Sequence, residues 1–162
     1  MRNMSVMFKG CKSLKNINLS SFNTDNLINM SDMFYECKNL KNIDLSNFQT
    51  ENVMNMNGIF MGCKSLINLN LSNFITQNLY KWMLLFFECL SLINIDLSNF
   101  NTKNTIDMSC MVYECNSLTN INLFKFNTEN VLNMSGMFIG CKSLTFCFYI
   151  FFMCLALIFT SL

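Results

Sequence analysis

The sequence predicts an α/β solenoid, a stack of similar coils, because it repeats with a constant period. One cysteine recurs every 26 residues, and leucine, phenylalanine, threonine and asparagine recur at fixed places between the cysteines. A unit of this size cannot bury its apolar side chains alone, but stacked units bury them against one another. The chain also has no proline, a residue that would remove an N–H from the coil-to-coil ladder in every copy.

The repeat divides the 162-residue chain into two parts. Five full units span 4–29, 30–55, 56–81, 82–107 and 108–133, and a sixth starts at Met134 and keeps register to about Thr145. We call these coils one to six and number the positions of a unit 1–26, with the cysteine at position 8. We therefore expect a solenoid over 4–145 and a separate hydrophobic tail over 146–162.

Each coil begins with a segment that predicts a short helix. In coil two, Met30, Met33, Phe34 and Cys37 follow the i, i+3, i+4, i+7 spacing of one helical face. The side chain of Asn29 or Ser31 is expected to cap its start.

The rest of the coil predicts one or two short strands. Residues 40–45 alternate apolar and polar side chains, which is typical of a strand. A second extended piece is expected at 52–54, after a turn at Ser46 and Asn47. Strands of successive coils would then pair at ~4.8 Å.

Two polar columns have predicted structural roles. Asparagine fills position 23 of every full unit (Asn26, Asn52, Asn78, Asn104 and Asn130), where its amide is expected to bond turn backbone. Position 7 is Gly10, Glu36, Gly62, Glu88, Glu114 and Gly140 in turn. This near-alternation is expected to limit repulsion between stacked carboxylates, although Glu88 and Glu114 are neighbours.

The composition argues against an enzyme, a cofactor and a nucleic-acid partner. Without histidine, no Ser-His-Asp triad, Cys-His dyad or histidine metal ligand can form. A net charge of +1 gives no field that attracts nucleic acid. No CxxC pair offers a metal site. The repeated cysteines are instead expected to be a packed structural ladder, formed by Cys11, Cys37, Cys63, Cys89, Cys115 and Cys141.

Three groups of residues are candidates for a partner surface. Coil four places Trp82, Met83 and Leu84, just after Tyr80, where other coils have smaller or more polar residues. This run is interpreted either as an exposed patch for a partner or as a locally thicker core. Two variable columns are expected on a binding face; one is Lys15, Lys41, Ile67, Ile93 and Thr119, and the other is Asp25, Glu51, Gln77, Lys103 and Glu129.

The tail over 146–162 is uncharged and has three interpretations. A helix of 17 residues would be ~26 Å long, close to the ~30 Å hydrocarbon core, which favours a membrane anchor. The alternatives are the product of a frameshift in the repeat array and a buried cap. No secretion signal is visible in the chain. We also expect self-association through the ends of the stack.

The pattern M-S-x-M-F-x-x-C-x-x-L-x-x-I-D-L-S-x-F-x-T-x-N-V-x-N resembles the leucine-rich repeats of BspA-type surface proteins. Residues 30–55 match it almost throughout, and the resemblance covers roughly 4–145. It implies a leucine-rich-repeat-like solenoid at a cell surface, used in adhesion or protein binding, with no catalytic residues. The alternatives are a membrane-tethered structural spacer and a fragment of a longer array with no function of its own.

Overall fold

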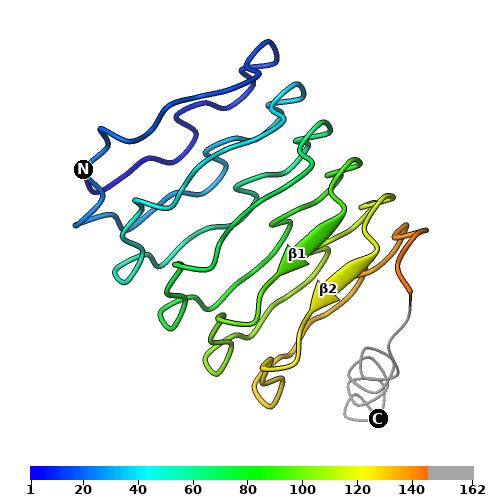
Figure 1. Ribbon diagram of the computed structural model, residues 1–162. Coiled ribbons are helices and arrows are strands. Elements are labelled where there is room, and N and C mark those ends of the chain that lie inside the picture. The colour runs from blue at the N-terminus through cyan, green and yellow to red at the C-terminus, as the bar shows by residue number, and fades with distance from the viewer. Residues whose placement is uncertain (146–162) are drawn as a thin grey trace.

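The computed structural model describes residues 1–145, in which each 26-residue unit makes one coil of a continuous stack. Figure 1 shows the coils side by side from the blue N-terminal end to the orange end, each a flattened loop with two long sides joined by two tips. The predicted solenoid is confirmed. The expectations for 146–162 lie outside the described residues.

Short parallel strands form on one long side of the stack. Strand β1 (Asn94–Asp96) pairs in parallel with β2 (Asn120–Asn122), and Ile95 lies opposite Ile121. Both strands occupy positions 13–15, within the segment that the alternation predicted. The backbone at position 12 extends the pairing to earlier coils, since the N–H of Lys41 donates to the carbonyl of Lys15 at 3.2 Å. The second extended piece, predicted at 52–54, forms no strand, and isolated bridges such as Asn29 with Asn55 occur directly after it at position 26.

The predicted short helix is wrong: residues 30–37 form consecutive turns, and no helix occurs within 1–145. Every second N–H stays in the segment, as when Tyr35 donates to the carbonyl of Asp32 at 3.1 Å. The N–H groups between them leave it, as when Phe34 donates to the carbonyl of Ile59 in the next coil at 2.9 Å. A helix directs its amides to carbonyls four residues earlier, so it cannot form this contact between coils.

Two positions in each of these turn segments adopt a left-handed backbone. Positions 3 and 7 have positive φ in all six coils, as in Asp32 (53°) and Glu36 (59°) of coil two. They stand third in a four-residue turn, where a type II turn requires positive φ and favours glycine. Glycine therefore suits position 7. In coils three and six, the side chain of the preceding coil's glutamate occupies the place where a Cβ at this position would lie. A Cβ built on Gly62 would lie 2.6 Å from Oε1 of Glu36. The near-alternation of glycine and glutamate at position 7 therefore has a steric cause in addition to the repulsion between carboxylates.

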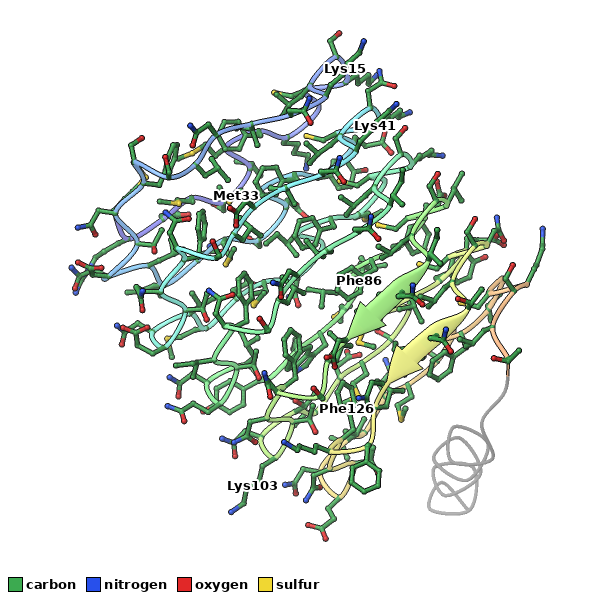
Figure 2. All side chains as sticks on the ribbon, viewed as in Figure 1. Lys15, Met33, Lys41, Phe86, Lys103 and Phe126 are labelled. Atoms are coloured by element: carbon green, nitrogen blue, oxygen red, sulfur yellow. The ribbon has the colours of Figure 1, made fainter. Side chains whose placement is uncertain are left out.

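The core is one continuous apolar column between the two long sides of the coils. Phe8, Phe34, Phe60 and Phe86 stack with nearly parallel rings, and their centroids lie 5.4, 5.8 and 5.9 Å apart. Figure 2 shows Met33, Phe86 and Phe126 inside the stack. Because each ring packs on the same residue of the next coil, the repeat itself produces the ladder.

Buried threonines join the coils on the polar side of the core. Thr76 is 1% exposed, and its hydroxyl accepts a 2.8 Å hydrogen bond from the N–H of Asn101 in the next coil. Thr50 and Thr102 make the same contact with the coils that follow them. The hydroxyl bonds a partly buried N–H of the next coil, which explains threonine in this column.

Candidate binding surfaces

The position-23 asparagines bond to the preceding coil, as predicted. The side-chain amide of Asn78 donates to the carbonyl of Glu51 at 2.8 Å, and that of Asn130 donates to the carbonyl of Lys103 at 2.8 Å. Asn52 and Asn104 do the same. These amides are required by the turns between coils and are therefore engaged within the fold.

The repeated cysteines lie in a single column, and five of the six are buried. The thiol of Cys89 donates to the carbonyl of Phe60 at 3.1 Å, and the equivalent contact recurs in coils two to six. Burial raises the pKa of Cys37 and of Cys141 to about 11, so these thiols keep their protons at neutral pH. Cys11, in the first coil, is exposed. The geometry gives the buried thiols a packing role and leaves them poor nucleophiles.

Trp82 belongs to the core, so the expectation that it is an exposed partner anchor is wrong. It is 1% exposed, its ring lies 4.9 Å from that of Phe100, and its Nε1 donates to Thr105 Oγ1 at 2.7 Å. Met83 and Leu84 are half-buried, and Tyr80 is 51% exposed. The interpretation as a thicker core therefore holds for the tryptophan, and Tyr80 alone of this run is well exposed.

The two variable columns lie at opposite tips of the coils. Figure 2 shows Lys15 and Lys41 at one tip and Lys103 at the other. In the first column Ile93 is exposed and Ile67 is half-buried; in the second Gln77 is exposed and Glu51 is half-buried. Because the core lies between the tips, the two columns cannot contact one compact epitope together.

An exposed apolar stripe runs across the stack at position 25, and the sequence reasoning found only one member of it. The stripe consists of Ile28, which is half-buried, and of Met54, Tyr80, Ile106 and Leu132, which are exposed. Met54 is 57% exposed and Leu132 is 83% exposed. The predicted extended piece at 52–54 held the signal, since alternation that buries Val53 at position 24 directs Met54 outward.

Backbone hydrogen bonds hold the stripe in register. The N–H of Met54 donates to the carbonyl of Ile28 at 2.9 Å, and that of Leu132 donates to the carbonyl of Ile106 at 2.8 Å. Beside the stripe, a shallow groove of about 330 Å³ is lined by Arg2, Asn26, Ile28, Asn52, Met54 and Asn78. The stripe and this groove form a fixed, largely uncharged surface.

The described part of the chain offers neither a metal cluster nor a membrane-spanning helix. Within 1–145, no three His, Cys, Asp or Glu side chains gather where they could hold a metal ion. No helix of these residues has the length and hydrophobicity needed to cross a bilayer. The membrane contact expected of 146–162 falls outside this region.

Comparisons with known proteins support the repeat and the fold. A family described as "Mycoplasma protein of unknown function, DUF285" matches residues 1–92 and 67–147. The crystal structure of a leucine-rich-repeat protein from T. pallidum is similar, with a TM-score of 0.52 and 16% identity over 90% of this chain and 72% of that one. No curated protein matches the sequence. At this identity the structural likeness concerns the fold.

Proposed function

This chain belongs to the family described as "Mycoplasma protein of unknown function, DUF285", and we propose that it is a non-enzymatic repeat protein that binds other proteins. The leucine-rich-repeat-like solenoid supports the proposal, because solenoids present long, regular surfaces on a rigid frame. The absence of histidine from the sequence removes the commonest general base and weighs against catalysis.

The position-25 stripe is the observation on which this proposal depends. Contiguous exposed apolar side chains are uncommon on soluble surfaces and mark sites of protein contact. Five coils place these side chains over about 20 Å at the spacing of paired strands. Tyr80 has the residue type of an interface anchor, and Met54 adapts its shape to a partner. Nearby polar side chains of position 22, such as Glu51 and Lys103, would set specificity at the rim.

The partner is proposed to be a protein presented at a cell surface. The resemblance of residues 30–55 to BspA-type repeats supports an adhesive role. The membrane-tethered spacer is the alternative. Extraction of membranes from cells that express the chain with and without 146–162 separates the two, since a spacer depends on the tail for its location.

Photocrosslinking tests the stripe as a protein-binding surface. A benzoylphenylalanine is placed at Tyr80, and in a control chain at Ile93 in the column at one tip of the coils. Each chain is then incubated with proteins extracted from cell surfaces and irradiated. We expect a discrete partner to crosslink at position 80 and not at position 93. The purified partner should then bind Tyr80→Ser at least about tenfold more weakly than the unchanged chain. Equal crosslinking at both sites, or unchanged affinity, would contradict the proposal.

A further inference from the structure

The strand side carries a second groove that shares no residue with the stripe. Its volume is about 380 Å³, within the range of small-ligand sites, and it crosses coils two to four. Side-chain amides and one carboxylate form its rim, from Asn42, Asn68, Asn70, Asn94 and Asp96. Ile43 and Leu69 also line it; Ile43 is buried in the core and Leu69 is half-buried.

The asparagines at position 13 stand apart from the others because the fold does not use most of them. Position 13 is asparagine in all five full coils, and each of these residues is exposed. Asn120 donates to Oδ1 of Asn94 at 3.1 Å. Within 1–145, the side chains of Asn16, Asn42 and Asn68 make no hydrogen bond. The amides of Asn42 and Asn68 are therefore available to a ligand.

The side chains at position 15 face the same way as those at position 13, but they bond to the backbone of the following turn. Asp96 Oδ1 accepts a 2.9 Å hydrogen bond from the N–H of Ser98, and Asn70 Oδ1 accepts one of 3.0 Å from the N–H of Ser72. The contact with Ser98 lowers the pKa of Asp96, which stays ionised at neutral pH. The turn therefore uses one oxygen of each side chain. The amide donor of Asn70 and the second oxygen of Asp96 remain for a ligand.

The chemistry of this groove favours one class of ligand. Each free amide offers donors and an acceptor without charge, which matches neighbouring hydroxyl groups that also donate and accept. The carboxylate of Asp96 disfavours an anion. An extended peptide adding as a strand would need an unpaired sheet edge. This groove lies instead on the face of the stack, where successive coils are bonded at position 12 and β1 is paired with β2.

We propose that this groove binds a neutral linear oligosaccharide, with the amides of Asn42, Asn68 and Asn94 bonded to its hydroxyls. The half-buried side chain of Leu69 would contact the C–H face of one sugar ring. Successive coils repeat the amide, so the sugar chain lies across the coils. The site goes beyond the proposed protein-binding function and uses other residues, so each can fail independently.

Calorimetric titration of the full chain tests this site. The probes are maltohexaose and chitohexaose, with a hyaluronan hexasaccharide as the anionic comparison. The variant is Asn42→Ala with Asn68→Ala, whose amides make no internal hydrogen bond, so the urea midpoint should be unchanged. Asn16→Ala is the matched control, because it has the same position and exposure but does not line the groove.

We expect at least one neutral hexasaccharide to bind and the anionic one to bind more weakly. The double variant should lose about tenfold in affinity and Asn16→Ala less than about twofold. Failure of both neutral probes to bind, or equal affinity of the double variant, would overturn the proposal. A face used for self-association would also overturn it, and would appear as a dimer that the double variant abolishes without any sugar binding.

Discussion

The indole N–H of Trp82 donates a 2.7 Å hydrogen bond to the hydroxyl of Thr105, and both side chains are buried. Both residues depart from the pattern of their columns within one coil. Position 1 is methionine in the other five coils, and position 24 is leucine or valine in the other full coils. A buried indole needs an acceptor, so the threonine compensates for the tryptophan.

Replacing Thr105 with a residue of similar volume should still destabilise the solenoid, because the hydroxyl is lost. Thr105→Val keeps the shape but leaves the indole N–H buried without a partner, at a cost of roughly 1–3 kcal/mol in the free energy of unfolding. Urea denaturation measures the change. Thr105→Ser keeps the hydroxyl and is the control. Restoring both column residues, with Trp82→Met and Thr105→Val, should cost less than the sum of the single changes. Additive effects would show that the two side chains are not coupled.

Alanine substitutions at Gly10 and Gly62 distinguish the cost of backbone strain from the cost of a clash between coils. Gly10 and Gly62 share position 7 and nearly the same φ, 73° and 74°, yet a Cβ on Gly10 meets nothing within 4 Å while one on Gly62 meets Glu36. Alanine at either site pays the left-handed backbone cost of roughly 1–2 kcal/mol. We expect Gly62→Ala to lower the urea midpoint further than Gly10→Ala. Adding Glu36→Ala should remove the difference, and equal losses from both glycine variants would contradict the steric explanation.

The buried thiols should make stability fall in alkaline solution. An unfolded cysteine ionises near its ordinary pKa of 9.0, whereas burial raises the pKa of Cys37 to about 11 and that of Cys89 well above 9.0. The folded state then holds protons that the unfolded state has released. The stabilisation by the buried thiols is complete below pH 9.0, and it is lost as the pH rises through the thiol pKa values of the folded state.

Urea midpoints measured under reducing conditions from about pH 8 to about pH 10 check this prediction. We expect the urea midpoint of the unchanged chain to fall as the pH approaches and passes 9.0, and that of Cys89→Ala to fall less. Cys11→Ala is the control, because this thiol is exposed. The same slope in all three chains would assign the decline to other groups.

The sequence predicted the surface less completely than the core, as a comparison of individual positions shows. Inward positions recur as apolar residues, so Leu66 and Phe74 are predictable from repetition alone and both are buried. Trp82 occupies such a position too, but a tryptophan there was compatible with a surface anchor as well as with a thicker core. Only its contact with Thr105, 23 residues later, shows that the coil makes room for it.

By itself, the sequence determined the period, the stacking of like residues and the identity of the core columns, because apolar side chains must recur wherever each coil meets the next. It did not determine the backbone of residues 30–37. Their apolar spacing fits both a helix and consecutive turns, and the choice depends on where the amide groups bond. The N–H of Phe34 reaches the carbonyl of Ile59 in the next coil, a partner that exists only once the coils are stacked. Tertiary structure therefore decided against the helix, and it also placed the position-25 stripe and the amide groove on separate surfaces.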